Sequence, residues 1–239
     1  MRVSLCLSGM PRNIDNSYQW LKDGILDVLK DNSIPYDIFV STWNNNVQKE
    51  GDSSVTTVGN SADDFIKVFS PKKFEVEEWD DNIRTALRWP EFEQCKYEII
   101  PRSSALGQWY KVFKCNELRK QYELENNVKY DVIFRIRTEI QYNNKLDFKE
   151  LEILEKHSHE PIIFLRRGPN PQNIFWTKDT FAFGNELGMN IYSNCHNHFV
   201  NVCQATKVST SELGLRNWLY NNPNLKIEHT SLDYTLIRN

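Results

Sequence analysis

The sequence predicts an α/β fold in which a mainly parallel, twisted sheet is flanked by helices. Short β-rich runs alternate with helical patterns of ten or more residues, and this alternation requires crossover connections between parallel strands. The 239 residues are 40% hydrophobic and 26% charged, the usual balance of a globular protein. We find no internal repeat or linker, so we expect one domain with two halves, residues 1–140 and 141–239.

The first half begins with a β-rich run at residues 3–7 that stops at a Ser-Gly-Met-Pro turn. A helix follows, with Tyr18, Leu21 and Ile25 at helical spacing. Residues 36–41 form a second buried strand, and the polar stretch 44–60 is expected to be a mobile loop. Ser61 and Asp64 resemble a capping box that opens a short helix ahead of a third strand at 74–76.

Residues 102–126 show the longest helical pattern and precede a strand at 132–140. The order β-α-β-α-β-α-β over this half fits one doubly wound nucleotide-binding unit. In the second half we expect helices at 146–154, 187–203 and 211–220, and strands at 162–165, 180–183 and 226–228.

Composition excludes several classes of protein. A net charge of −3 and a pI near 6.0 argue against a non-specific nucleic-acid binder, which carries a basic field. There is no apolar run near 18 residues, so we expect no transmembrane segment. Five cysteines without a C-x-x-C pair do not resemble a secreted disulfide framework. We therefore expect a cytoplasmic protein with reduced thiols.

The segment VIFRIRTEI at 132–140 carries the strongest anomaly. A strand buried in a parallel sheet is normally apolar throughout, yet period-two alternation places Arg135, Arg137 and Glu139 on one face. These charges gather at the carboxyl end of the strand, where open α/β sheets bind ligands. The competing interpretation is an edge strand with a solvated, salt-bridged face. We favour a binding site, because burying charge without a function is costly.

Two other segments offer groups for an anionic ligand. Ser8, Gly9 and Arg12 lie in the loop that leaves the first strand, where glycine permits close backbone approach and a helix N-terminus follows. An ordinary βα turn explains this loop at least as well, because neither G-x-G-x-x-G nor a P-loop is present. Arg102 and Gln108, at the start of the long helix, could line the same cleft.

Asp179 and Glu212 are the candidate general bases. Asp179 precedes the strand at 180–183, and Glu212 opens the last helix. The alternatives are a solvated strand-end aspartate and a glutamate that favours the helix dipole.

Cys195, His198 and Cys203 superficially suggest zinc, but both cysteines fall on the apolar stripe of their helix, so we reject a zinc site.

Taken together, VSLCLSGMPRN, IFVSTWN, RSSALGQWYKVFKCNELR, YDVIFRIRTEI and DTFAFGN resemble segments of small glycosyltransferases encoded in surface-polysaccharide loci and in some large DNA viruses. The WavE-like lipopolysaccharide-synthesis group is similar. The resemblance covers most of the chain in order. It implies a GT-A fold, a nucleotide-sugar donor, and a glycan or lipid-linked saccharide acceptor.

The resemblance also implies roles for individual residues. In GT-A enzymes an Asp-x-Asp motif holds Mn²⁺ or Mg²⁺ against the donor diphosphate, and here the matching position reads Arg137-Thr138-Glu139. Glu139 would be the single carboxylate ligand of a divalent metal, helped by His229, with weak or absent metal dependence because Arg137 replaces an acid. The remaining implied contacts are Ser8, Gly9 and Arg12 with the nucleotide, Thr42 and Trp43 with the base, Arg102, Gln108 and Arg135 or Arg137 with the diphosphate or sugar, and Asp179 or Glu212 with the acceptor.

Two other functions remain open at this point. A nucleotidyltransferase could use a similar sheet, although the chain has no Gly-rich, Lys-containing phosphate loop. A catalytically inactive sugar- or nucleotide-binding relative would tolerate the incomplete Asp-x-Asp motif. The sequence does not identify the donor sugar, its nucleotide, the particular acceptor or the oligomeric state.

Overall fold

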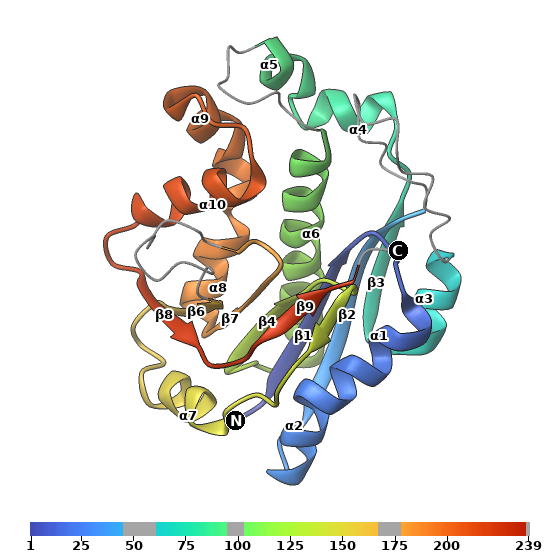
Figure 1. The fold of residues 1–239 in the computed structure, drawn as a ribbon, viewed down its shortest axis with the longest axis vertical. Coiled ribbons are helices and arrows are strands. Elements are labelled where there is room, and N and C mark those ends of the chain that lie inside the picture. Colours follow the sequence, from blue (N-terminus) through green and yellow to red (C-terminus); the bar gives the residue numbers. More distant parts are fainter. Residues whose placement is uncertain (45–60, 95–102, 167–177, 238–239) are drawn as a thin grey trace.

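A computed structural model describes residues 1–44, 61–94, 103–166 and 178–237. Its centre is a seven-stranded sheet in the order β3-β2-β1-β4-β7-β6-β8, and a two-stranded sheet pairs β5 with β9 (Figure 1). β7 is antiparallel to both of its neighbours, and the other adjacent pairs in the large sheet are parallel. The predicted α/β class with a mainly parallel sheet is therefore confirmed. The strands are β1 (Val3–Gly9), β2 (Tyr36–Trp43), β3 (Lys73–Glu77), β4 (Val132–Ile136), β5 (Ile140–Tyr142), β6 (Ile162–Arg166), β7 (Phe181–Gly184), β8 (Lys226–Thr230) and β9 (Tyr234–Leu236).

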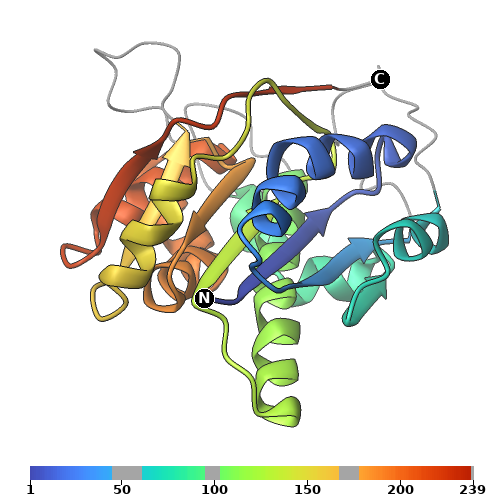
Figure 2. The same cartoon turned by 90° about the horizontal axis from the view of Figure 1, so that it is seen from below.

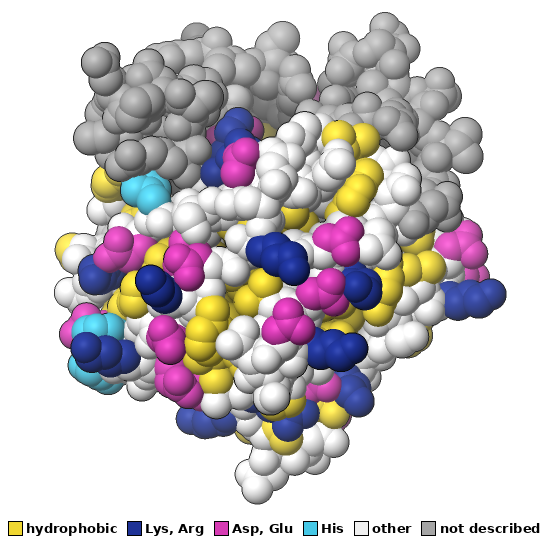
Figure 3. Space-filling model, turned by 60° about the horizontal axis from the view of Figure 1, so that its bottom comes forward, with side chains coloured by type: hydrophobic (Ala, Val, Ile, Leu, Met, Phe, Trp, Pro, Cys, Tyr) yellow, Lys and Arg dark blue, Asp and Glu magenta, His cyan; other side chains and the backbone are white. Residues whose placement is uncertain are grey.

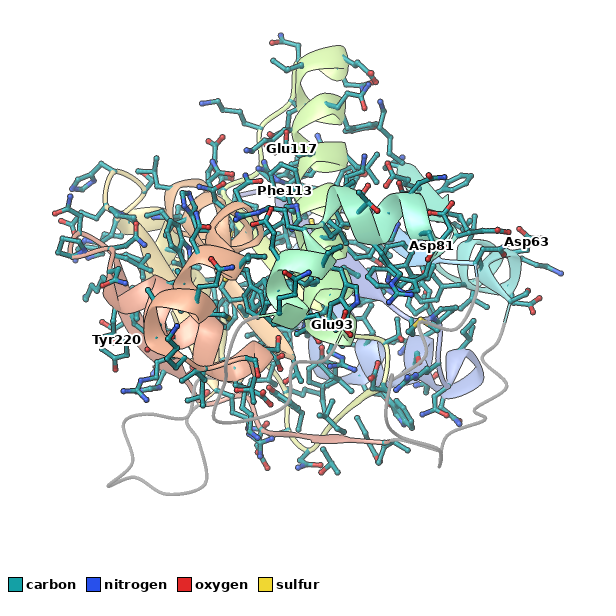
Figure 4. The ribbon with its side chains drawn as sticks, turned by 90° about the horizontal axis from the view of Figure 1, so that it is seen from above. Asp63, Asp81, Glu93, Phe113, Glu117 and Tyr220 are labelled. Atoms are coloured by element: carbon teal, nitrogen blue, oxygen red, sulfur yellow. The ribbon has the colours of Figure 1, made fainter. Side chains whose placement is uncertain are left out.

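Helices cover both faces of the large sheet (Figure 2). One face packs against α1, α3 and α7, and the other against α6 and α8. Seen from above, α5, which carries Glu93, lies between α4, which carries Asp81, and α10, which carries Tyr220 (Figure 4). The helices are α1 (Ile14–Leu21), continued by a π-helical turn (Lys22–Leu26) and α2 (Asp27–Asp31), then α3 (Ala62–Phe69), α4 (Asp81–Ala86), α5 (Trp89–Gln94), α6 (Ser103–Asn126), α7 (Phe148–Lys156), α8 (Glu186–Ser193), α9 (Cys195–Thr206) and α10 (Ser211–Tyr220).

Strand alternation divides the hydrophobic core into two layers. Phe134 of β4 packs on the α1 side, where its ring stacks on Phe183 with centroids 4.8 Å apart. Ile133 of β4 faces the opposite layer, which includes Trp109 of α6 and Phe199 of α9. Because neighbouring residues of β4 point into different layers, Arg135 enters the α6 layer, not the α1 layer.

The predicted strand at 132–140 is too long. β4 ends at Ile136, the chain turns through residues 137–139, and β5 begins a second sheet with β9. The turn is held from outside the segment, because the Thr138 hydroxyl donates to the Met10 carbonyl oxygen at 3.1 Å. Arg137 and Glu139 therefore do not continue the β4 face, but they still lie at its carboxyl end.

Several other boundaries differ from those predicted. The expected helix at 187–203 is divided into α8 and α9 at Asn194, and α4 and α5 precede the long helix α6. The capping role of Ser61 is confirmed, since its hydroxyl oxygen accepts from the Asp64 backbone N–H at 3.1 Å. Nearly all of the expected loop at 44–60 lies outside the described residues.

The surface of the described residues is mixed in charge. Figure 3 shows Lys and Arg side chains interspersed with Asp and Glu side chains over the face that it presents. None of the helices in the described ranges combines the length and apolar composition that crossing a bilayer requires. The four cysteines in those ranges, Cys6, Cys115, Cys195 and Cys203, are buried and free of disulfide bonds.

Asn185 joins three segments and gives a test of this architecture. Its side-chain oxygen accepts from the backbone N–H groups of Gly188, at 2.9 Å, and Ile162, at 3.2 Å, and its amide donates to the Glu160 carbonyl oxygen at 2.5 Å. Asn185→Ala removes a helix cap and leaves buried groups unpaired, so we expect a loss of about 1–3 kcal/mol in the free energy of unfolding. Urea denaturation measures this loss. Asn197→Ala, on exposed α9 surface, is the control, and equal loss in both variants would contradict the assignment.

Candidate functional site

The candidate site lies where the strand order of the large sheet reverses. From β1 the chain proceeds to β2 and β3 on one side, and then returns to place β4 on the other side of β1. Open α/β sheets bind ligands beyond the carboxyl ends of the strands at such a switch point. Here that point lies between the turn after β1 and the turn at residues 137–139.

Backbone geometry brings these two turns together. Gly9 has φ of +120°, a conformation that side-chain-bearing residues rarely adopt, and it reverses the chain at the end of β1. The Thr42 hydroxyl donates to the Gly9 carbonyl oxygen at 2.8 Å. On the β4 side, the Ser17 hydroxyl donates to the Thr138 carbonyl oxygen at 2.6 Å. The start of α1 is therefore fixed beside the turn that follows β4.

A continuous chain of polar side chains crosses this junction. Arg12 Nη1 lies 3.8 Å from Glu139 Oε1, and Arg137 Nη2 donates to the same oxygen. Arg137 Nη1 donates to Gln108 Oε1 at 3.1 Å, and Gln108 Nε2 donates to Asp179 Oδ2 at 2.6 Å. The structure thus brings together five of the residues that the sequence predicted, from the turn after β1, the turn after β4, helix α6 and the approach to β7.

The two arginines lie nearer to solvent than the acid between them. The side chains of Arg12 and Arg137 are 22% and 17% exposed, whereas that of Glu139 is 2% exposed. Burial by itself would raise the pKa of Glu139, but Arg137 and Arg12 outweigh it and hold this pKa below its usual value. Glu139 is therefore an ionised support at neutral pH, and an approaching anion meets the guanidinium groups first.

The carboxyl groups of Asp179 and Glu212 form the second part of the site. Thr210 caps α10 by accepting from the Leu213 backbone N–H at 3.4 Å, which places Glu212 in the first turn. Gln108 Nε2 lies 3.1 Å from the Ser211 hydroxyl and so links α10 to Asp179. Burial and the charge of Asp179 raise the pKa of Glu212. A carboxyl group with a raised pKa next to a second carboxylate is suited to proton transfer.

The two residues predicted to contact the base are buried in the structure. Trp43 is buried in an aromatic cluster, with its ring stacked on Tyr110 at 5.8 Å and edge-on to Trp79 at 5.3 Å. Lys111 Nζ lies 4.1 Å from the centroid of the Trp43 ring. Thr42 is also buried, and its hydroxyl is used by Gly9. Thr42 thus holds the turn after β1, whereas Trp43 packs against Tyr110 and Lys111 of α6, and both side chains are buried.

The other predicted residues are distributed as follows. Ser8 is buried at the carboxyl end of β1, and Arg135 is buried in the α6 layer. Arg102 lies outside the described residues. His229 is exposed on β8, which β7 and β6 separate from β4, roughly 14 Å away at normal strand spacing. The structure therefore does not bring His229 to Glu139.

The residues at the β4 turn do not fit a divalent metal well. Mg²⁺ and Mn²⁺ need carboxylate or other oxygen ligands around one point. Glu139 is the acid at this turn, and its Oε1 atom is already bound by two guanidinium groups, whose charge opposes a dication. Within the described ranges, no cluster of three or more His, Cys, Asp or Glu side chains could hold a metal ion.

Sequence reasoning missed two supporting residues. Thr138 joins the two turns through its hydroxyl, and Ser211 positions Gln108 through a hydrogen bond. Thr138 lies between Arg137 and Glu139, and this position could have marked it as part of the site. Ser211 carried no signal, because its partner lies 103 positions away in the chain.

Glu212 gives a pH-dependent test of this geometry. A carboxyl group whose pKa is higher in the folded than in the unfolded protein lowers stability where it is ionised, and this cost disappears as the pH falls through the folded pKa. Glu212→Gln is therefore expected to raise the melting temperature at pH 7, with a gain that shrinks toward pH 4. Differential scanning fluorimetry across this range measures it. Glu186→Gln, in the first turn of α8, is the control, and a pH-independent effect of Glu212→Gln would contradict the assignment.

A scan against models of protein families and a search of curated protein sequences found no match to this chain.

Proposed function

We propose that the protein is a glycosyltransferase that moves a sugar from a nucleotide-sugar donor to a glycan or lipid-linked saccharide acceptor. The observation that carries this proposal is the pairing of two anion-facing arginines with two carboxyl groups at the switch point of the sheet. Arg12 and Arg137 lie on one side of Gln108, and Asp179 and Glu212 lie on the other. The first pair suits a diphosphate, and the second suits an acceptor hydroxyl.

The diphosphate is the leaving group of the proposed reaction. Negative charge builds on it as the bond to the sugar breaks, and fixed positive groups that face this charge lower the barrier. Arg12 and Arg137 are held by Glu139 before any ligand binds, so little reorganisation is needed. The Gly9 turn allows the backbone to approach the phosphates closely.

Glu212 is the proposed general base. Its carboxylate takes the proton of the acceptor hydroxyl while the acceptor oxygen attacks the anomeric carbon. The bond between that carbon and the diphosphate oxygen breaks, and the nucleoside diphosphate leaves with the electron pair. Attack opposite the leaving group inverts the anomeric configuration. Asp179 raises the pKa of Glu212 and so increases its basicity.

We further propose that the reaction depends weakly or not at all on a divalent metal. In this account Arg12 and Arg137 supply the positive charge that a metal provides in typical GT-A enzymes. This proposal is supported by the ion pairs that both guanidinium groups form with Glu139, the carboxylate that would have to bind the metal ion. Activity that disappears with a chelator and returns with Mn²⁺ would contradict this proposal.

Ligand-induced stabilisation tests the donor class. We expect one family among UDP, GDP, CMP and dTDP, with or without an attached sugar, to raise the melting temperature by several degrees, because a ligand at a hundred times its Kd stabilises by about 2.7 kcal/mol. The shift should persist in excess chelator. If none of these nucleotides changes the melting curve, the nucleotide-sugar proposal fails.

Replacing the proposed base tests the chemistry separately from donor binding. Glu212→Gln should lower kcat by roughly 10²–10⁴-fold and leave the nucleotide-induced melting shift intact. Once the donor is identified, release of the nucleoside diphosphate with and without acceptor measures this effect. Glu186→Gln should retain full turnover. Near-normal turnover by Glu212→Gln would remove Glu212 from the mechanism, and equal donor hydrolysis without acceptor would argue against an acceptor-activating base.

A further inference from the structure

Arg135 is a buried cation for which the described residues provide no hydrogen-bond partner. Its side chain is 2% exposed, and Nε, Nη1 and Nη2 all lack an acceptor. The strands on either side of it offer none, because its register partners are Cys6 of β1 and Ala182 of β7. Burying an arginine without a partner is strongly unfavourable. The fold therefore retains Arg135 at a cost to its own stability.

The other fully buried arginine of the α6 layer shows the usual solution. Arg119 Nη1 donates to Glu123 Oε2 at 2.6 Å, and Arg119 Nε donates to Asn116 Oδ1 at 3.0 Å. Asn190 Oδ1 lies 3.5 Å from Arg119 Nη2. Among the described residues, one buried guanidinium is thus surrounded by acceptors and the other has none. The contrast indicates that the acceptor for Arg135 comes from outside the described residues.

The α6 layer that Arg135 enters contains further buried polar groups without a hydrogen-bond partner among the described residues. The Tyr192 hydroxyl and the Trp109 indole N–H are both buried without a partner, and their rings meet edge-on at 5.4 Å. Among charged groups, Arg135 has the largest effect on the pKa of Tyr192, which it lowers against the raising effect of burial. Tyr192 belongs to the same α6 layer as Cys6 and Ala182, the register partners of Arg135. Arg, Trp and Tyr together can satisfy an oxyanion, which only accepts hydrogen bonds.

Ser8 connects these donors with the site at the edge of the sheet. Arg135 pairs in register with Cys6, and Ser8 is the next residue on the same face of β1, roughly 7 Å nearer the carboxyl end. Its hydroxyl is also buried without a partner. Arg135 is the residue before the last one of β4, so Arg137 and Glu139 of the following turn lie close to it in the chain. Burial lowers the pKa of Arg135, and the charges of Arg137, Asp179 and Glu139 also act on it.

We propose that Arg135, with Tyr192, Trp109 and Ser8, binds an oxyanion of the substrate behind Arg137. The inference rests on the proposed function and extends it, because it requires a second anionic group deeper in the sheet than the one that Arg12 and Arg137 meet. Two groups of a nucleotide sugar share this chemistry: a phosphate of the diphosphate and a carboxylate on the sugar. Either would form the paired hydrogen bonds that a guanidinium fork favours.

The test compares Arg135→Met with Arg119→Met. Without ligand, Arg135→Met should raise the melting temperature by several degrees, because it removes an unpaired buried charge and keeps a similar volume. Arg119→Met should lower it, because Glu123 and Asn116 lose their partner. An Arg135→Met variant that melts below the wild type, as Arg119→Met does, would overturn the proposal, since Arg135 would then be a structural residue.

Ligand binding gives the second readout. Wild type, Arg135→Met and Arg135→Lys are titrated with inorganic pyrophosphate, nucleoside diphosphates, neutral nucleotide sugars and nucleotide-linked uronic acids. We expect at least tenfold weaker binding in both variants. Arg135→Lys keeps the positive charge but loses the paired hydrogen bonds of the guanidinium group. If only the affinity for nucleotide-linked uronic acids falls, the oxyanion is the carboxylate of the sugar. If the affinity for all nucleotides falls, the oxyanion is a phosphate.

The outcomes separate this inference from the proposed function. Nucleotides that bind the wild type and both Arg135 variants equally would overturn the inference and leave the proposed function standing. If pyrophosphate binds in an Arg135-dependent manner and no nucleotide binds, the oxyanion site stands and the nucleotide-sugar proposal fails.

Tyr192→Phe keeps the packing of the ring and removes its hydroxyl, so it should weaken binding several-fold with little change in melting temperature. Unchanged binding would remove Tyr192 from the site.

Discussion

The ion pair between Arg137 and Glu139 is the interaction on which the candidate site depends. A carboxylate as buried as that of Glu139 needs cations beside it, and Arg137 and Arg12 supply them. This requirement holds the turn after β1 against the turn after β4, and it leaves two guanidinium groups facing outward. Because Gln108 bonds to Arg137 and to Asp179, the same pair also determines where the acidic half of the site lies.

The mainly parallel sheet could be predicted because the alternation of strands and helices depends on local patterns. Apolar runs alternate with helical periodicity along the first 140 residues, and this alternation leaves few arrangements of the sheet. The end of β4 could not be predicted in the same way. Period-two alternation continues to residue 140, but Thr138 bonds to Met10 and residues 140–142 pair with β9, and these contacts join residues far apart in the chain. The antiparallel direction of β7 is likewise a consequence of tertiary packing.

The candidate site was predicted best where charge appeared in an apolar pattern. Arg135, Arg137 and Glu139 interrupt a buried strand, and burial makes such charges costly unless they are used. The burial of Trp43 was not predicted, because an aromatic residue at the end of a strand suits both a binding platform and a core. Its burial against Tyr110 and Trp79 depends on segments that no local pattern connects with it. The distance between His229 and β4 could not be predicted either, because it depends on the order of the strands in the sheet.

The stability of the fold and the proposed activity place opposite demands on two residues. Arg135 is buried without an acceptor, and Glu212 has its pKa raised by burial and by Asp179. Each lowers the stability of the free protein. Arg135 suits a site that binds an anionic ligand, and Glu212 suits a site that accepts a proton. Such local conflicts are expected where a sequence serves function instead of packing.

A crystal structure of the protein with the nucleoside diphosphate that stabilises it most would show directly where the donor binds. We expect the diphosphate to lie between the Gly9 turn and Arg137, with Arg12 on a phosphate oxygen and Glu212 facing the side from which an acceptor would approach. A diphosphate bound away from the carboxyl ends of β1 and β4 would contradict this expectation, whatever the affinity.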